Sequence, residues 1–515
     1  MKKYILVFTA LLSSSLLVSQ TEFDALKIVQ TDILGTARYM SMAGAFGALG
    51  GDASAIKDNP AGLGIYRSSE MTGTVNLMFQ NSNSKWNATE RNDNTTGVGF
   101  NNLSYIKFSP TMLSNNSGTG LLSSNWSFSY NRLRNFDRVS TIKSGEQNSS
   151  ISDYMAYFTG DIKSSNLIAS ANPYNNISIP WISELAFQGY LINETVNPNT
   201  GLSSWSSAIG NTITPSYTIR ENGHIDEYSI GWAGNFSNIF YVGATFNIES
   251  LEYTANSQYI ENYGNSTGMT LTNVVTTSGT GFNLNIGAIL RPTDFLRVGA
   301  SIHSPTFFAL TDNNYANLDY YFSSTMNGNL STPMSADNPP YSMTTPWKFN
   351  GSAAIIIGTK GLLSAEYNYS SNTHTTFMDE NGNSQSFEDE NTGMKTMLKD
   401  VQTWKFGAEY KLTPNLSLRA GYATVSAGSN PLADKLMRYN TTRTDTEYFL
   451  DNGSNYITAG FGYRENNWFV DFAYVNKTVN ETFYPYNSNK LPFQVSPASV
   501  STTTNNLVFT VGYKF

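Results

Sequence analysis

Cysteine is absent from the 515 residues of the sequence. Its absence excludes disulfides, thiolate metal sites, cysteine nucleophiles and a lipid anchor on an N-terminal cysteine. Charge is also scarce, because only 14% of the residues are charged, where a soluble globular chain has about a quarter. The formal net charge of −8 argues against a nucleic-acid partner. No apolar run of about 18 residues occurs, so the sequence predicts no transmembrane helix.

The first 19 residues have the features of a secretory signal. Lys2 and Lys3 precede an apolar run from Ile5 to Val18, and the small residue Ser19 stands before Gln20. We therefore expect an exported protein whose mature chain begins at Gln20. Export still permits a membrane location, because transmembrane strands alternate in polarity and keep the average hydropathy low.

A period of two residues dominates the chain from about residue 68 to the end. At the C-terminus, Leu507, Phe509, Val511, Tyr513 and Phe515 alternate with smaller or more polar residues. The pattern predicts fourteen strands, near residues 68–80, 97–109, 124–136, 225–236, 239–253, 279–291, 295–309, 346–358, 361–372, 401–412, 415–427, 455–465, 467–479 and 505–515. An even number of strands with one apolar face indicates an all-β fold, a closed transmembrane antiparallel barrel with a polar interior. A large secreted β-sandwich or propeller is the alternative.

The connections between these strands alternate in length. Tight turns are expected near residues 237–238, 292–294, 359–361, 413–415 and 466–467. Long polar segments separate them, at about 81–96, 137–224, 254–277, 310–345, 373–400, 428–454 and 480–504. Short turns on one side and long loops on the other are typical of a bacterial outer-membrane barrel.

The longest of these loops, residues 137–224, contains two apolar stretches. Residues 151–158 and 181–191 are apolar enough for two short helices. Helices at the mouth of a barrel form a landing site for a hydrophobic ligand if their apolar side chains are exposed. The alternative is a helical lid that packs on its own neighbours.

Two irregularities break the alternation of the strands. Val98 and Phe100 share a phase, but after Asn101 and Asn102 the phase is reversed, which predicts a β-bulge. The bulge is either a register adjustment or a deliberate gap in the barrel wall. Two arginines also disturb the outward face of the third strand, Arg132 and Arg134.

Residues 20–67 precede the strands and have no sustained period. The run from Gly50 to Gly64 is rich in glycine and alanine and is interrupted by Pro60. Such a segment is either an ordinary loop or a compact plug inside the barrel. We predict the plug, followed by the barrel over residues 68–515.

The sequence gives little support to a catalytic or a metal-binding site. His303 faces the predicted lumen but Ser304 lies on the opposite face of the strand, which disfavours a hydrolase. Asp379, Asn381, Asn383 and Glu390 match four positions of a calcium loop, but the glycine is misplaced and a solvated acidic loop is the simpler interpretation. No phosphate loop, dinucleotide fingerprint or zinc motif occurs, so we expect no cofactor, no bound metal and no enzymatic activity.

The stretch from Gly51 to Leu63 resembles the hatch signature of the FadL/TodX family of outer-membrane long-chain fatty-acid and hydrocarbon transporters. The signature is a short acidic and alanine-rich stretch that leads into Asn59-Pro60-Ala61 just before the first strand. The preceding Met42 to Phe46 is similar to the family's upstream glycine segment. The family's fourteen strands and N-terminal plug also agree with the predicted architecture.

The resemblance implies a passive channel for hydrophobic molecules such as long-chain fatty acids. Ligand would be captured by external loops, here through Trp181, Leu185, Phe187 and Tyr190. A hatch formed by Asn59, Pro60, Ala61 and Gly62 would then move, and the ligand would leave sideways through a gap in the wall. Asn101 and Asn102 are the candidates for that gap, although the family's kink lies in the third strand.

The partners expected on this reading are a hydrophobic small molecule, outer-membrane lipid and lipopolysaccharide, and the barrel-assembly machinery, which would bind the C-terminal strand ending in Phe515. The protein is expected to act as a monomer in the bacterial outer membrane. Two other functions fit a barrel of this kind: a general or solute-specific porin, and a surface receptor, for example for haem, that works through residues 137–224.

Overall fold

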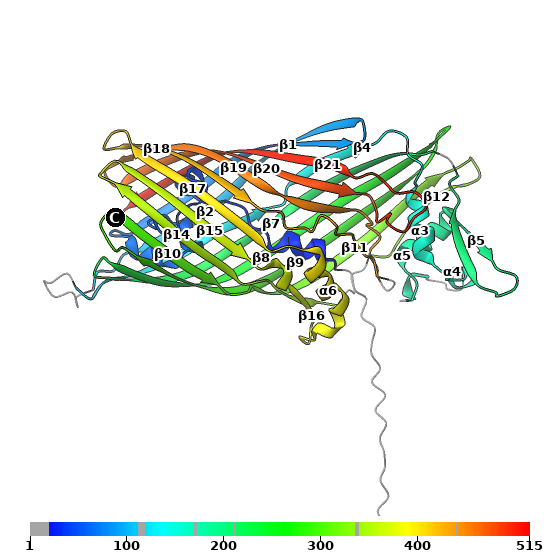
Figure 1. The fold of residues 1–515 in the computed structure, drawn as a ribbon, viewed down its shortest axis with the longest axis horizontal. Coiled ribbons are helices and arrows are strands. Elements are labelled where there is room, and N and C mark those ends of the chain that lie inside the picture. The colour runs from blue at the N-terminus through cyan, green and yellow to red at the C-terminus, as the bar shows by residue number, and fades with distance from the viewer. Residues whose placement is uncertain are drawn as a thin grey trace, which may run out of the picture.

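The computed structural model describes residues 20–111, 119–168, 173–176, 178–210, 212–334, 339–438 and 441–515. The predicted signal, residues 1–19, lies outside these residues. In Figure 1 the long axis of the molecule is horizontal, with the C-terminus and the short turns at one end and the helices α3 to α5 at the other. These two ends are called the short-turn end and the long-loop end below.

A closed antiparallel barrel forms the body of the molecule. Its fourteen strands in the described residues are β1 (Glu70–Trp86), β2 (Thr89–Lys107), β3 (Leu121–Asn135), β7 (Thr214–Phe236), β8 (Phe240–Gly264), β9 (Thr267–Leu290), β10 (Leu296–His303), β14 (Lys348–Ile357), β15 (Gly361–Ser370), β17 (Val401–Lys411), β18 (Leu416–Val425), β19 (Tyr448–Glu465), β20 (Trp468–Tyr484) and β21 (Ala498–Lys514). The last strand pairs with the first over its whole length, from Glu70↔Lys514 to Trp86↔Ala498. The predicted fourteen-stranded barrel is confirmed, because every predicted range overlaps one of these strands.

Shorter strands extend this barrel at the long-loop end. They are β4 (Arg138–Lys143), β11 (Phe307–Tyr321), β12 (Asn327–Ser331), β13 (Tyr341–Thr344) and β16 (Thr376–Asp379), with a separate hairpin of β5 (Ile192–Val196) and β6 (Ser203–Ser207). The prediction that residues 81–96 and 254–277 are loops is wrong. The strands β1 and β2 run on to a tight turn at Asn87, and β8 and β9 to one at Asn265 and Ser266, all at positive φ. The outer faces of these extensions are mostly polar, so the outward apolar alternation that reveals a strand within the membrane is missing there.

The tight turns at the short-turn end follow the sequence prediction. Ser237 and Asn238 connect β7 to β8 with φ of 58° and 56°, the left-handed pair that a two-residue hairpin turn needs. Asn466, at φ 52°, begins the turn between β19 and β20.

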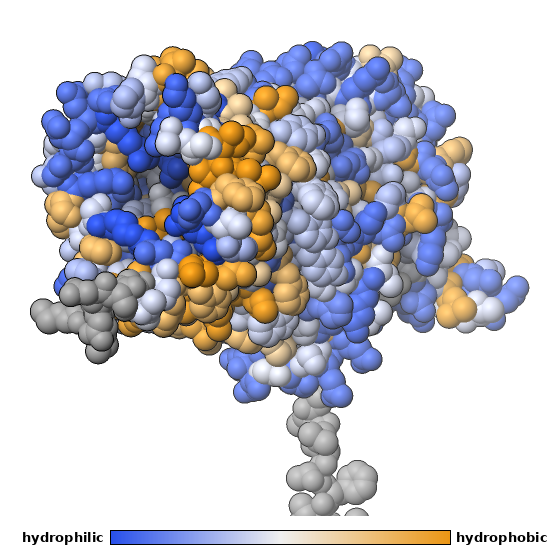
Figure 2. Space-filling model, turned by 60° about the vertical axis from the view of Figure 1, so that its left-hand side comes forward, coloured by the Kyte–Doolittle hydropathy of each residue, from blue (hydrophilic) through white to orange (hydrophobic). Residues whose placement is uncertain are grey.

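The outer surface of the barrel carries an apolar band. Met71, Val75, Leu77 and Phe79 of β1 point outward and are about half exposed, whereas the residues between them are buried or half-buried. Figure 2 shows such side chains gathered over part of the barrel, with hydrophilic residues beyond them. Transmembrane barrels present an apolar band of this kind to lipid. Among the helices that the structure describes, none has the length and apolar character needed to cross a membrane.

The segment that precedes β1 lies in the lumen as short helical pieces. They are α1 (Glu22–Val29), α2 (Ala37–Ser41) and the 3₁₀ turns η1 (Ser54–Lys57) and η2 (Pro60–Ile65). Helix α1 begins with a capping box, in which the Thr21 hydroxyl accepts from the backbone N–H of Asp24 and the Asp24 carboxylate accepts from that of Thr21. The backbone N–H of Ala37 donates to Thr510 Oγ1 on β21, and Thr458 Oγ1 on β19 donates to the carbonyl of Ser41.

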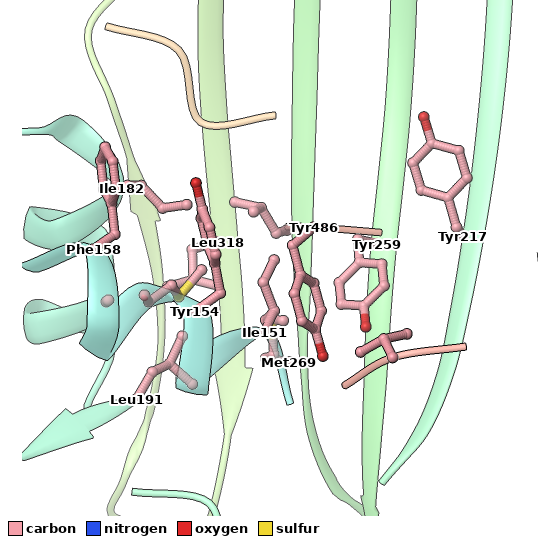
Figure 3. Packing of buried hydrophobic residues seen from close by; sticks show 14 of the residues in the cluster. Ile151, Tyr154, Phe158, Ile182, Leu191, Tyr217, Tyr259, Met269, Leu318 and Tyr486 are labelled. Atoms are coloured by element: carbon pink, nitrogen blue, oxygen red, sulfur yellow. The ribbon is translucent and has the colours of Figure 1, made fainter. Parts of the chain in front are cut away.

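Helices at the long-loop end form an apolar cluster with the extended strands. They are α3 (Ile151–Thr159), α4 (Ser164–Ile168), η3 (Pro173–Asn175) and α5 (Trp181–Gln188); α6 (Glu388–Met397), η4 (Asn372–His374) and η5 (Ser384–Phe387) lie in another loop. The two helices predicted in residues 137–224 therefore occur. Figure 3 shows Tyr154 and Phe158 of α3 facing Leu318 of β11 and Tyr486.

Leu185→Ala tests how this cluster is held. Leu185 of α5 is fully buried, and truncation of a buried leucine costs about 2–5 kcal/mol. We expect faster limited proteolysis within residues 151–210 while the barrel keeps its thermal unfolding midpoint. Tyr157→Ala, at a half-exposed position of α3, is the matched control. Equal protease resistance of L185A and the wild type would contradict this packing.

Candidate functional site in the barrel lumen

The segment predicted as the hatch is seated against glycines of the barrel wall. The Asn59 side chain caps η2 by accepting from the N–H of Ala61 at 3.1 Å, and its amide donates to the carbonyl of Ala288 on β9 at 3.2 Å. A Cβ at Gly243 would lie 2.5 Å from the Pro60 carbonyl oxygen, and one at Gly287 would overlap the Asn59 side chain. Only glycine allows η2 to approach the wall this closely.

Ion pairs fix the rest of this segment. Lys405 of β17 contacts Asp58 at 3.2 Å and Glu366 of β15 at 2.9 Å, and the other Glu366 oxygen accepts from the backbone N–H of Gly47 at 2.7 Å. The three side chains are far apart in the chain, and no sequence signal pairs them.

A second ion-pair network lies nearer the short-turn end. Arg38 of α2 contacts Glu409 at 3.0 Å, Glu409 contacts Arg419 at 2.6 Å, and Arg419 contacts Asp471 at 2.5 Å. All four side chains are largely buried. Because removal of one partner would leave a buried charge unpaired, such a chain holds its members firmly in one arrangement.

A space in the lumen, called the central cavity here, has about 1630 Å³ of empty volume, including solvent at its opening. One wall is apolar and includes Ile28, Val29, Leu133, Ile225 and Phe308. The other wall is polar and includes Glu227, Glu249, Asn283, Asn285 and His303. The cavity is therefore amphipathic.

A second space, the vestibule, lies toward the long-loop end and has about 1220 Å³. Its lining includes the chain Lys27–Glu221–Arg138–Glu481, in which Lys27 contacts Glu221 at 2.7 Å and Arg138 contacts both glutamates. The vestibule and the central cavity share five lining residues, which are Gln30, Arg134, Asp451, Lys477 and Val479. Gln30 lies between the two spaces, because its side chain binds both Arg134 and Asp451.

The barrel wall is interrupted between β2 and β3. The ladder between them runs only from Lys107↔Trp126 to Asn102↔Asn131. Just beyond this point Asn101 is the extra residue in β2 opposite β1, and Leu133 is the extra residue in β3 opposite β7. The predicted bulge is confirmed, and a second bulge faces it across the interruption.

A third space, the side pocket, adjoins the interruption. It has about 550 Å³, and its lining includes Gly99, Asn101 and Arg132. Asp32, Ile33 and Lys477 line both the side pocket and the central cavity. The bulges of β2 and β3 thus lie where the lumen comes closest to the outside of the barrel wall.

Helix α1, which separates the vestibule from the central cavity, is anchored by a buried carboxyl. Glu22 packs against the backbone of Gly393 in α6, and its carboxyl lies 3.8 Å from the guanidinium of Arg438. Burial raises the pKa of Glu22 to about 7, partly offset by hydrogen bonding to the backbone and by Arg438. The neutral form is therefore favoured in the folded protein, and ionisation at higher pH weakens the docking of α1.

The four residues predicted for external capture lie in different environments. Leu185 is fully buried in the apolar cluster of the long-loop end, and Phe187 packs against that cluster. Trp181 is nearly buried and packs edge-on against Tyr174. Tyr190 is exposed, with its ring 5.9 Å from that of Tyr320. The burial of Trp181 and Leu185 favours the alternative that these helices form a lid that packs on its own neighbours.

The residues considered for catalysis and calcium have other partners. His303 Nε2 lies 2.8 Å from the Asp58 carbonyl, whereas Ser304 Oγ donates to the Pro305 carbonyl. One Asp379 oxygen accepts from the N–H groups of Asn381 and Asn383, and Glu390 contacts Arg438 instead. Within the described residues no group of three or more metal-ligating side chains occurs.

Gly243→Ala tests the seat of η2. The added methyl meets backbone atoms of Pro60 and Ala61, which cannot rotate away, and overpacking of this kind costs about 1–3 kcal/mol. We expect faster hydrogen exchange of residues 59–65, measured by mass spectrometry. Gly351→Ala on β14, where a Cβ meets nothing within 4 Å, should leave the exchange unchanged. Unchanged exchange in G243A as well would refute the close seating.

Comparisons with known proteins identify the family. The model of the family "Outer membrane protein transport protein (OMPP1/FadL/TodX)" matches residues 224–515, more than half of the chain. A Pseudomonas aeruginosa FadL homologue superposes with a TM-score of 0.55 at 13% identity, over 95% of this chain and 99% of that one. The P. putida toluene transporter TodX gives 0.50 at 13% identity, over 94% and 99%.

At these identities the superpositions establish the fold alone, and a search of curated proteins finds no match. The family match agrees with the closed fourteen-stranded barrel. The chain therefore belongs to the OMPP1/FadL/TodX family of outer-membrane transport proteins and is itself a barrel of the outer membrane.

Proposed function

We propose that this protein is a passive channel that takes up hydrophobic small molecules and releases them sideways into the outer membrane. One observation carries the proposal. Three spaces that share lining residues lie next to one another between the long-loop end and the interruption between β2 and β3. A ligand that follows them leaves through the wall instead of through the short-turn end, which the N-terminal segment occupies.

The apolar wall of the central cavity supplies the driving force for binding. Each methylene that moves from water onto such a surface gains about 0.8 kcal/mol. Val29 of α1, Leu133 of β3 and Phe308 of β11 contribute to this wall from three directions. Leu133 is also the extra residue of β3, so the apolar wall leads directly to the proposed exit.

The exit continues into an apolar outer surface. Phe100 of β2 and Tyr130 of β3 face outward on the two sides of the interruption, with their rings stacked at 5.6 Å. A hydrophobic molecule that passes the largely polar side pocket meets this apolar outer surface and the lipid beyond it. A water-filled exit would offer its tail no favourable environment.

The hatch proposal concerns Asn59, Pro60, Ala61 and Gly62. These residues are buried against the wall and held mainly by hydrogen bonds from Asn59 and close contact with glycines. Asn59 adopts an extended conformation, φ −143° and ψ 104°, as expected before proline. A change in the backbone dihedral angles of this residue would alter the direction of η2 without unfolding a helix.

The substrate class proposed is long-chain fatty acids or similar apolar molecules. Structurally similar proteins include a toluene transporter and a monoaromatic hydrocarbon channel, and an apolar cavity wall suits either class. Of the predicted capture residues, Tyr190 is the one whose ring is exposed at the long-loop end. We further propose that the protein acts as a monomer without enzymatic chemistry, and that Phe515, whose backbone pairs with Ser69, carries the assembly signal.

The second candidate is a solute-specific porin for polar nutrients. The ion pairs that line the vestibule favour it, because a charged constriction selects polar solutes. The two functions differ in their path, since a polar solute must leave through the short-turn end past the N-terminal segment.

A disulfide between Asn59→Cys and Gly287→Cys tests the hatch. A Cβ at residue 287 would lie 2.9 Å from the Asn59 Cγ, which the first substitution removes, and the chain has no other cysteine. We expect uptake of a radiolabelled long-chain fatty acid to fall on oxidation and recover on reduction of the same protein. Uptake that is equal in both states would refute hatch movement, and loss of polar-nutrient uptake alone would favour the porin.

Deletion of Asn101 tests the lateral exit. Both Asn101 and Asn102 are buried toward the lumen, so removing one restores strict alternation without turning any other residue of β2 to the wrong face. We expect the ladder between β2 and β3 to lengthen and fatty-acid uptake to fall to background, with the barrel still folded. Deletion of Asn466 in the short turn between β19 and β20 is the control. Full uptake by the Asn101 deletion would place the exit elsewhere.

A further inference from the structure

The polar wall of the central cavity contains two adjacent carboxylates. Glu227 of β7 and Glu249 of β8 are directly paired in the ladder, which places their Cβ atoms about 5 Å apart on the lumenal face. Both line the cavity and are 3% and 8% exposed. Two acidic side chains so close together repel each other unless a cation or a proton lies between them.

The hydrogen-bond partners of these carboxylates are neutral. Asn131 donates to Glu227 Oε1 at 3.3 Å, and Glu249 Oε1 accepts from Asn283 at 2.5 Å and from Thr306 at 3.0 Å. Within the part of the chain that the structure describes, neither carboxylate forms an ion pair at 4 Å or less. Each therefore retains a second oxygen for another donor.

The cations around the cavity are directed elsewhere. Lys405 binds Asp58 and Glu366, and Lys477 binds Asp32. Lys57 donates to the backbone carbonyl of Leu34, and Lys348 to that of Val29 at the end of α1 at 3.3 Å. These lysines hold the N-terminal segment in place, so the two glutamates are left without a counter-charge in contact.

A second observation also indicates missing donors. Asn285 and Asn350 line the same cavity and are 3% and 8% exposed, and the side-chain oxygen of each has no hydrogen-bond partner. Their amide nitrogens are already used, toward Lys57 O and Asn368 Oδ1. Both of these unpartnered atoms are acceptors, and an ammonium group offers three donors and no acceptor.

We propose that the central cavity binds a cationic amphiphile, an alkyl chain that ends in an amine. The ammonium lies between Glu227 and Glu249, and the chain lies on the apolar wall formed by Val29, Leu133 and Phe308. Because Leu133 is next to the interruption between β2 and β3, the apolar end of the ligand faces the exit. This inference rests on the proposed channel for hydrophobic molecules, and within that broad class it assigns the central cavity to an amine instead of a fatty acid.

The test compares three ligands that share a twelve-carbon tail: dodecylamine, dodecanol and dodecanoate. Binding to the full-length mature protein in a neutral maltoside detergent is measured at pH 7 by native mass spectrometry. We expect dodecylamine to bind about tenfold or more tightly than the other two, the size of a charge-assisted contact. The double variant E227Q/E249Q should lose this preference and keep the binding of dodecanol.

The matched control is Glu252→Gln, an outward and exposed position on the same strand as Glu249, which should keep the preference. Equal binding of the three ligands to the wild type, or a preference that survives in E227Q/E249Q, overturns the inference but leaves the hydrophobic channel intact. Tighter binding of dodecanoate than of dodecylamine overturns the inference and indicates that the lysines of the cavity bind the head group instead. Failure of all three ligands to bind overturns the proposed function as well. If the double variant does not fold, the comparison of the three ligands in the wild type still tests the inference.

Discussion

The requirement that backbone N–H and C=O groups be paired where they face hydrocarbon governs this structure. In lipid, an unpaired peptide group costs several kcal/mol, so strands can span a membrane only as a closed ladder. The pairing of β21 with β1 over seventeen residues on each strand meets this requirement. The interruption between β2 and β3 is therefore a costly feature, and two bulges facing each other at one level indicate that it is built into the fold.

Other contacts compensate for the interruption. The extension β4 lies beside β1 and β2 toward the long-loop end. There the N–H of Thr141 donates to Asp93 at 2.6 Å, and Ser82 binds Ser140 at 3.0 Å. On the other side of the gap, Arg132 pairs with Asp226 at 2.9 Å, and Arg134 binds Gln30 of the N-terminal segment. The wall is thus kept together by side chains where the ladder ends, and side chains can move without breaking the barrel.

Charged side chains hold the N-terminal segment inside the lumen. A lumen packed with apolar side chains would block the passage of solutes, whereas an unfilled polar lumen would let small polar solutes through the membrane. The N-terminal segment fills the lumen through ion pairs such as Lys405 with Asp58 and Arg38 with Glu409, and through close approach of η2 to Gly243 and Gly287. Because breaking a buried ion pair leaves a charge unpaired, these contacts hold the N-terminal segment in one arrangement.

The fold was predictable from the sequence because a two-residue period is a local signal that survives in every membrane-spanning strand. The slip at Asn101 and Asn102 also revealed a bulge, since it reverses the phase of the alternation. The prediction of loops at residues 81–96 and 254–277 is wrong because strands beyond the membrane have a mostly polar outer face, and the outward apolar alternation is lost there. Leu133 was missed as the second bulge because the charged residues on either side obscure the phase there.

What the sequence by itself determined is the closed barrel, its number of strands and the place of an irregular segment before it, since these depend on local periodicity. Only the tertiary structure decided which residues are neighbours in space. It shows that the bulges of β2 and β3 meet, that Lys405 binds Asp58, and that Glu227 and Glu249 share one wall of the cavity. The physical reason is that register and curvature bring together residues tens to hundreds of positions apart, and no local pattern of polarity encodes those pairings.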